Sequence, residues 1–234
     1  MDRTTPEEED LSLSRRAWAG LLWFLAVLAL MIFLPAWTLA YWQAWIFIAH
    51  FTLWMVALSR YFLKHDPALV RRRMNVGPTA EREPFQKRIQ AATSLLLVAA
   101  FVVPALDHRL GWSALPVSAV VGGHLLLAAG YFAIFRTFQA NSFASAVVEV
   151  GAGQRVISTG PYALVRHPMY VGAILLFLGV PLALGSWWGL LVVPPLTAAL
   201  ALRAVHEESL LVRDLAGYAE YRGKVRHRFF PAIW

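Results

Sequence analysis

Six apolar segments dominate the hydrophobic pattern of the chain, and each is almost free of formal charge. Because about 20 apolar residues in a helix cross the hydrocarbon core of a bilayer, the pattern predicts an all-α, polytopic membrane protein. Trp and Tyr residues gather near the segment ends, as they do at membrane–water interfaces. The six predicted membrane segments cover residues 17–34, 41–62, 89–106, 114–135, 169–184 and 187–204.

The last two segments are joined only by Gly185 and Ser186. Such a short connection predicts a tight antiparallel helical hairpin. The segment 169–184 is also short for a membrane span, so we expect a tilted pair or a helix that does not fully cross.

Composition agrees with this class of protein. Apolar residues make up 59% of the 234-residue chain and charged residues 15%, against about 25% charged in soluble domains. The chain contains no cysteine, which excludes disulfides, thiolate metal sites and cysteine nucleophiles, and we expect no metal. The acidic run at residues 7–10 argues against a cleavable signal peptide.

The basic residues predict the orientation. Every Lys and Arg except Arg109 falls on one side of the six segments, in the tails, in the connections or at the adjoining segment ends. The positive-inside rule then places both termini in the cytoplasm, and we expect a multi-pass protein of a bacterial inner membrane. Topology therefore accounts for the net charge of +7, and nucleic acid is not an expected partner.

Two cytoplasmic connections are too long to be simple turns. Residues 64–88 are expected to form a surface helix and a turn. Residues 146–157 show the pattern of a short β-hairpin that turns at Gly151–Gly153. We divide the chain into an N-terminal four-helix membrane region, residues 1–136, and a C-terminal cofactor-binding region, residues 137–234, within one structural domain.

The first group of residues that could bind a ligand lies at the start of the fifth segment. Pro168 suits the first turn of a helix, and the N–H groups after it would face the cytoplasm and could hold an anion. Arg166 and His167 add donors at the same place. The alternative is a turn followed by ordinary interfacial residues.

A second polar cluster, residues 203–208, stands where the sixth segment leaves the membrane. Arg203 and Glu207 are four apart and share a helical face. A solvated helix end with a weak ion pair is one interpretation. The predicted hairpin favours another, because it brings this cluster beside residues 160–170 in a single pocket at the membrane surface.

These residues carry a family resemblance over about residues 137–234. The chain resembles the isoprenylcysteine carboxyl methyltransferase family, integral membrane enzymes related to phospholipid methyltransferases. The resemblance lies in four motifs: Gly160-x-Tyr162, Arg166-His167-Pro168-x-Tyr170-x-Gly172, Arg203-x-x-x-Glu207-Glu208 and Gly217-Tyr218-x-x-Tyr221.

The resemblance implies S-adenosylmethionine as methyl donor, held in a cytoplasmic pocket, and a lipophilic acceptor arriving from the bilayer. It implies that Arg203 faces the acceptor carboxylate and acts in catalysis. Gln154 departs from the family, since eukaryotic members have His there. The residues that the resemblance places at the cofactor are Gln154, Arg155, Val156, Ile157, Tyr162, His167, Pro168, Met169, Tyr170 and Glu207.

Several alternatives stay open. A membrane reductase of the sterol or steroid type shares an Arg-His-Pro-x-Tyr motif but uses NADPH, and it generally carries an Arg-Asp-Glu cluster after the last segment. Asn141 could bind substrate or cap a helix. His50 and His124 could ligate a haem, although a neutral histidine bridging two helices is favoured. Besides the acceptor and membrane lipids, no obligate protein partner is expected.

Overall fold

The computed structural model describes residues 6–74, 83–144, 153–231 and 234. Within these ranges the protein is helical and contains no strand, which confirms the predicted all-α class. The longer elements are α1 (Pro6–Ala36), α2 (Trp42–His65), α4 (Pro84–Leu110), α5 (Val117–Ala140), α6 (Pro168–Ala183) and α7 (Val193–Asp214). The shorter ones are α3 (Pro67–Met74), α8 (Tyr218–Lys224) and the 3-10 turns η1 (Gly160–Ala163) and η2 (Trp188–Val192).

Among the described residues, five helices are long and apolar enough to cross a membrane: α1, α2, α4, α5 and the η2–α7 unit. The sixth predicted segment is also helical, but α6 has only 16 residues. At 1.5 Å per residue it extends about 24 Å, less than the roughly 30 Å of a bilayer core. Large apolar side chains such as Trp23 and Leu95 are more than 70% exposed, and lipid is the environment that suits them.

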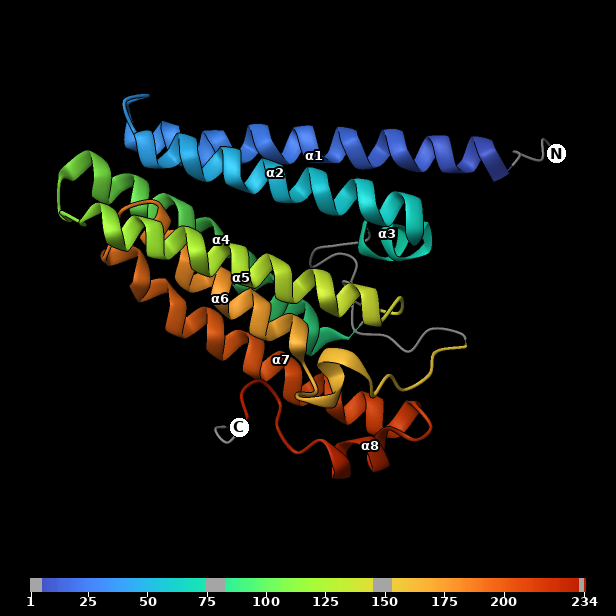
Figure 1. Ribbon diagram of the computed structural model, residues 1–234. Helices are drawn as coiled ribbons and strands as arrows, with labels where there is room; N and C mark the ends of the chain where they lie inside the picture. The colour runs from blue at the N-terminus through green and yellow to red at the C-terminus, as the bar shows by residue number, and fades with distance from the viewer. Residues whose placement is uncertain (1–5, 75–82, 145–152, 232–233) are drawn as a thin grey trace.

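Figure 1 shows α1 and α2 running side by side, with the other long helices slanting beneath them. The connection between α6 and η2 is the predicted tight turn, and α6 and α7 pack against each other. Gly185 takes a left-handed φ of +75° in this turn, a conformation that glycine adopts without steric cost. The turn brings the start of α6 and the last turns of α7 to the same end of the molecule.

Helices α5 and α6 form the closest packing, and glycines make it possible. A Cβ on Gly172 of α6 would lie 2.8 Å from the backbone oxygen of Gly130 on α5. Gly123 and Gly179 repeat this arrangement seven residues away, where a Cβ on Gly179 would lie 2.9 Å from the Gly123 oxygen. Small residues at such positions let helix backbones touch inside membranes. The contact holds α6, and hence His167 at its start, in a fixed position.

Replacing Gly123 by Ala should therefore lower the thermal unfolding midpoint in detergent. Its Cβ would lie 2.8 Å from the Leu182 carbonyl carbon, and overpacking of this kind costs about 1–3 kcal/mol. The matched control is Gly122→Ala, because a Cβ on the adjacent Gly122 meets nothing within 4 Å. Equal midpoints for the two variants would contradict this account of the α5–α6 contact.

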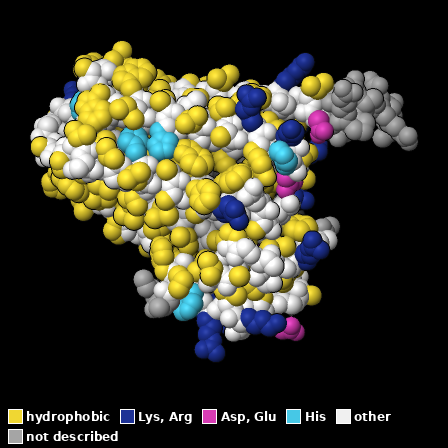
Figure 2. Space-filling view, in the orientation of Figure 1, with side chains coloured by type: hydrophobic (Ala, Val, Ile, Leu, Met, Phe, Trp, Pro, Cys, Tyr) yellow, Lys and Arg dark blue, Asp and Glu magenta, His cyan; other side chains and the backbone are white. Residues whose placement is uncertain are grey.

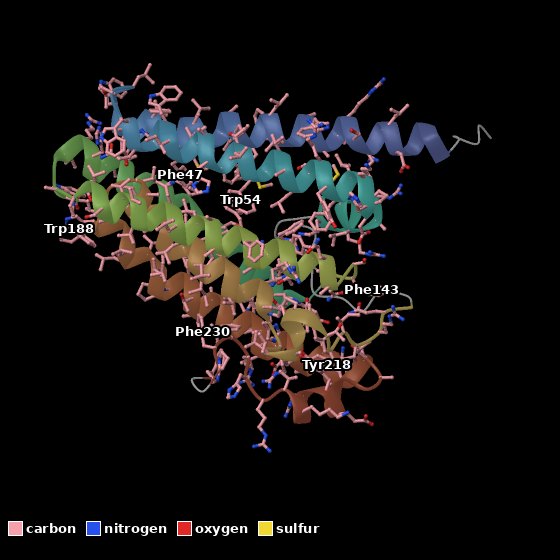
Figure 3. The ribbon with its side chains drawn as sticks, in the orientation of Figure 1. Phe47, Trp54, Phe143, Trp188, Tyr218 and Phe230 are labelled. Atoms are coloured by element: carbon pink, nitrogen blue, oxygen red, sulfur yellow. The ribbon has the colours of Figure 1, made fainter. Side chains whose placement is uncertain are left out.

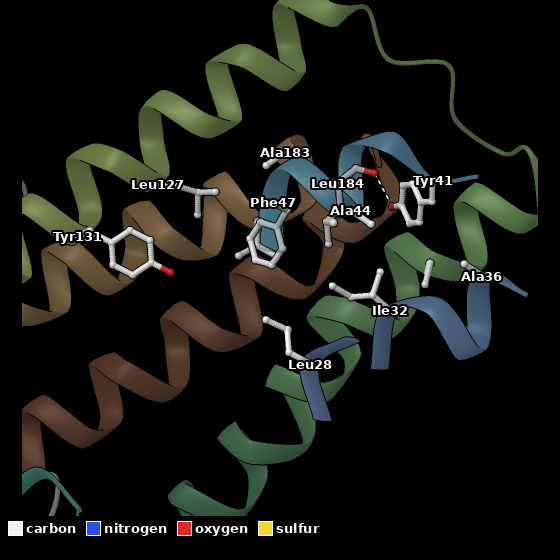
Figure 4. Packing of buried hydrophobic residues seen from close by; sticks show 12 residues of the cluster. Leu28, Ile32, Ala36, Tyr41, Ala44, Phe47, Leu127, Tyr131, Ala183 and Leu184 are labelled. Carbon is white, nitrogen blue, oxygen red and sulfur yellow. Dashed lines mark hydrogen bonds between the residues drawn. The ribbon is translucent and has the colours of Figure 1, made fainter. Parts of the chain in front are cut away.

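The far end of the bundle is closed by an apolar core that includes Leu28, Phe47 and Leu127 (Figure 4). The Tyr41 hydroxyl donates to the Leu184 carbonyl across this core at 2.5 Å. His50 and His124 also lie between helices, with their Nδ1 atoms 2.9 Å apart. The histidines therefore bridge α2 and α5, as the favoured interpretation proposed.

The predicted hairpin in residues 146–157 was wrong where it can be examined. Its first limb, residues 146–150, lies outside the described residues, as do Gly151 and Ala152. The second limb, residues 155–157, is irregular chain with no strand. Val156 packs on Leu215 and on Tyr218 and Tyr221 of α8, so side-chain contacts with these residues hold the segment. The surface helix expected in residues 64–88 is present as α3, while residues 75–82 lie outside the described part.

Basic and apolar side chains occupy different ends of the molecular surface. Figure 2 shows Lys and Arg concentrated at the end where α1 begins and around the C-terminal elements, with hydrophobic side chains covering the opposite end. Arg109 lies at that opposite end, where its guanidinium stacks 5.6 Å from the Trp37 ring centroid. The polar end of the molecule is also where the candidate site lies.

Candidate functional site

A pocket opens at the polar end of the bundle, between the end of α5, the start of α6 and the last turns of α7. It has an empty volume of about 840 Å³, part of it open to solvent. Figure 3 labels Phe143 and Tyr218, two of its lining residues, at this end of the molecule, and Trp188 at the other. The lining residues are Asn141, Phe143, Ala144, Gln154, Arg155, Val156, Ile157, Tyr162, Arg166, His167, Pro168, Met169, Tyr170, Glu207, Leu211, Leu215, Tyr218 and Tyr221.

All ten residues that the resemblance placed at the cofactor line this one pocket, together with Asn141. They come from four separate stretches of the chain: 141, 154–157, 162–170 and 207. The convergence of residues 160–170 with residues 203–208, expected from the hairpin, is confirmed as geometry. Their roles in binding stay predictions.

Asn141 is both a helix cap and a pocket residue. It ends α5, and its backbone N–H donates to the Thr137 carbonyl. Its side chain accepts from the Phe143 N–H at 2.9 Å and donates to the Tyr162 hydroxyl at 3.0 Å. Tyr221 in turn donates to the Tyr162 carbonyl at 2.8 Å, so the 3-10 turn η1 is held from both sides.

The start of α6 is fixed by a buried carboxylate. Pro168 is the first helical residue, as predicted, and His167 is the N-cap residue. Glu208 accepts two hydrogen bonds from Arg166, at 2.7 and 3.3 Å, and a third from Arg228 at 3.1 Å. His167 Nε2 lies 3.2 Å from the same carboxylate. A bidentate arginine pair of this kind is among the stronger and more directional hydrogen-bonded contacts.

The C-terminal tail completes this anchor. The backbone N–H groups of Arg166 and His167 donate to the carbonyls of His227 and Arg228, each at 2.9 Å. Arg166 Nη1 also donates to the carbonyls of Val225 and Arg226 at 2.8 Å. The tail therefore packs back on the pocket.

A second network connects the pocket to Arg203. The Tyr170 hydroxyl donates to Glu207 Oε2 at 2.8 Å and accepts from Arg203 Nε at 3.2 Å. Arg203 Nη1 donates to Gln90 Oε1 on α4 at 3.0 Å. Arg203 is buried and is not one of the residues lining the pocket, so it reaches the pocket through Tyr170.

Burial sets the protonation of the pocket phenols outside the membrane helices. It raises the pKa of Tyr162 to about 12, although the hydrogen bond from Asn141 opposes the rise. Burial also raises the pKa of Tyr218 and of Tyr221 well above the ordinary value, and nearby carboxylates add to the effect. All three hydroxyls therefore stay protonated at neutral pH and can donate hydrogen bonds.

Sequence reasoning gave no role to several residues that line or support the pocket. Tyr218 lines it, and among the described residues its buried hydroxyl has no hydrogen-bond partner. The Gly217-Tyr218-x-x-Tyr221 motif was the available signal for Tyr218 and Tyr221. Glu208 stood in a recognised motif, but its partners come from elements distant in sequence. The sequence contains no signal for Arg73, because it is the last of three consecutive arginines and no motif distinguishes it from the other two.

Residues 118–216 match the model of the phospholipid methyltransferase family. This match confirms the resemblance to membrane methyltransferases. It begins within α5, earlier than the predicted boundary at residue 137, and ends before α8. A search of curated proteins found no match.

Proposed function

Taking residues 118–216 as a segment of the phospholipid methyltransferase family, we propose that this membrane protein transfers a methyl group from S-adenosylmethionine to an amphiphilic acceptor. The acceptor is the carboxylate of an isoprenylcysteine-like or other lipophilic compound. The observation that carries the proposal is the single pocket that gathers His167, Tyr170 and Glu207 beside the irregular segment 154–157.

The pocket suits the proposed donor. Apolar and aromatic side chains such as Val156, Ile157 and Phe143 can cover a nucleobase, and Glu207 can accept hydrogen bonds from ribose hydroxyls. The buried Tyr218 hydroxyl gives further support, because an unpaired buried hydroxyl is costly unless a ligand satisfies it.

Little acid–base chemistry is required of the protein. When bound, S-adenosylmethionine supplies a methyl carbon that its sulfonium already activates. An acceptor carboxylate is ionised at neutral pH, so an acceptor oxygen bonds to the methyl carbon as the carbon–sulfur bond breaks, and no proton moves. The protein contributes alignment and exclusion of water, and alignment can supply about 7–11 kcal/mol of the barrier.

The two side chains that hydrogen-bond the Tyr170 hydroxyl, Glu207 and Arg203, then have different roles. Glu207 orients the donor from the pocket. Arg203, on α7 one turn earlier, pairs with the acceptor anion. We place this end of the molecule in the cytoplasm, because the basic residues gather there, and the acceptor enters from the surrounding bilayer.

The family match favours methyl transfer over the reductase alternative, and a binding experiment separates the two. S-adenosylhomocysteine should raise the melting temperature of the purified protein, because only a ligand of the folded state stabilises it, and NADPH should not. A shift with NADPH alone would overturn the proposal.

Tyr218→Phe should lower the affinity for S-adenosylhomocysteine about 5- to 10-fold, because it removes one hydroxyl with which the ligand would form a hydrogen bond. Isothermal titration would measure the change. The control is Tyr61→Phe, because Tyr61 hydrogen-bonds Gln139 and does not line the pocket. Equal affinities for the wild type and Tyr218→Phe would remove Tyr218 from the donor site.

A further inference from the structure

Arg73 reaches the candidate site from α3, an element outside the family-matched segment. Its Nη1 donates to the sulfur of Met169, a pocket-lining residue, at 3.5 Å. Its guanidinium also stacks over the Phe138 ring, 4.7 Å from the centroid. The side chain is therefore directed toward the start of α6.

Arg73 and Arg203 act electrostatically on the same small region. Burial lowers the pKa of Arg73, the neighbouring Tyr170 raises it, and the positive charge of Arg203 lowers it further. Arg203 is itself hydrogen-bonded to Tyr170. Arg203 thus contacts the Tyr170 hydroxyl directly, and Arg73, on a separate helix, contacts Met169, the residue that precedes Tyr170.

The preceding arginines of α3 have different surroundings. Arg72 donates to the Ser142 carbonyl at 2.6 Å and stacks 5.4 Å from the Phe143 ring centroid. Arg71 is half-exposed and pairs with Asp10 at 3.6 Å. Of these three arginines, Arg73 is the one that contacts Met169 beside Tyr170.

We propose that Arg73 and Arg203 together form a binding site for the anionic headgroup of the acceptor, a carboxylate or a phosphate on an amphiphile. The inference rests on the proposed function and extends it to substrate class. Arginine's planar fork matches both anions. Glu207 offsets one of the two positive charges, and a bound anion neutralises the other, which relieves the repulsion between the two cations.

The site also explains how the first helices take part in recognition. Residues of α3, α4 and α7 would surround the headgroup, with Gln90 holding Arg203 from the α4 side. The apolar chain of the acceptor would remain among the lipid-facing helices. An uncharged headgroup would leave the two cations uncompensated, so it should bind more weakly.

Three probes test the inference by direct binding to the full-length protein in detergent: N-acetyl-S-farnesylcysteine, its neutral carboxamide, and farnesyl phosphate. The wild type should bind at least one anionic probe about 10-fold or more tightly than the carboxamide. Arg73→Gln should remove most of that preference, and Arg73→Lys should retain part of it. Arg71→Gln, the control on the same helix, should behave as the wild type.

The anionic probe that binds more tightly identifies the headgroup, and either result supports the site. Equal binding of all three probes to the wild type would overturn it, as would an unchanged preference in Arg73→Gln. If Arg73 had only a structural role, Arg73→Gln would weaken the binding of all three probes and of S-adenosylhomocysteine equally. That result would also overturn the inference. Failure of S-adenosylhomocysteine to bind the wild type would refute the proposed donor separately, without affecting the probe comparison.

Discussion

Arg203→Ala should reduce kcat/KM for methyl transfer by roughly 10²- to 10³-fold. The variant removes the buried cation that would pair with the acceptor anion, and leaving one member of a buried charge pair alone costs about 3–5 kcal/mol. It also removes the donor to the Tyr170 hydroxyl. Turnover would be measured with labelled S-adenosylmethionine and a membrane extract, followed by identification of the labelled product.

Two comparisons separate this role from loss of structure. Arg213→Ala removes the same side chain from the same helix, but Arg213 is exposed and pairs with its neighbour Asp214, so the activity of this variant should be unchanged. S-adenosylhomocysteine should bind Arg203→Ala with near-normal affinity, because Arg203 does not line the donor pocket. Near-normal turnover in Arg203→Ala would refute the assignment.

Glu208→Ala should have the largest effect on stability. Glu208 is 2% exposed and pairs with Arg166 and Arg228, so its removal leaves the buried Arg166 guanidinium without its countercharge. Breaking a buried pair in this way costs about 3–5 kcal/mol. The unfolding midpoint should fall by several degrees. S-adenosylhomocysteine should bind more weakly, because Arg166 and His167 line the pocket.

Glu220→Ala is the matched control, since Glu220 is an exposed carboxylate on α8. The unfolding midpoint of Glu208→Gln should lie between those of Glu208→Ala and Glu220→Ala, because the amide keeps the shape and one acceptor oxygen while losing the charge. If Glu208→Ala and Glu220→Ala unfolded at the same temperature, the anchor between α6, α7 and the tail would not contribute to stability.

Particular residues show where sequence reasoning sufficed. Pro168 marked the first turn of α6 because its ring fixes φ and it lacks an N–H, a property of the residue itself. The two-residue link at Gly185 predicted the hairpin, and the hairpin alone was enough to bring Glu207 toward His167. The prediction at residues 155–157 was wrong because a local pattern was interpreted as a strand, whereas Val156 is partly buried against Leu215, Tyr218 and Tyr221.

The sequence by itself determined the helical class, the apolar lengths, the sidedness of charge and the motifs around Pro168 and Glu207. These are local properties, set by hydrophobic run length and by the geometry of a single turn. The tertiary structure alone decided that Glu208 anchors Arg166 and the tail, that Arg203 hydrogen-bonds Tyr170, and that Arg73 contacts Met169. Those contacts depend on how helices far apart in the chain approach one another, and no periodicity within one helix encodes that approach.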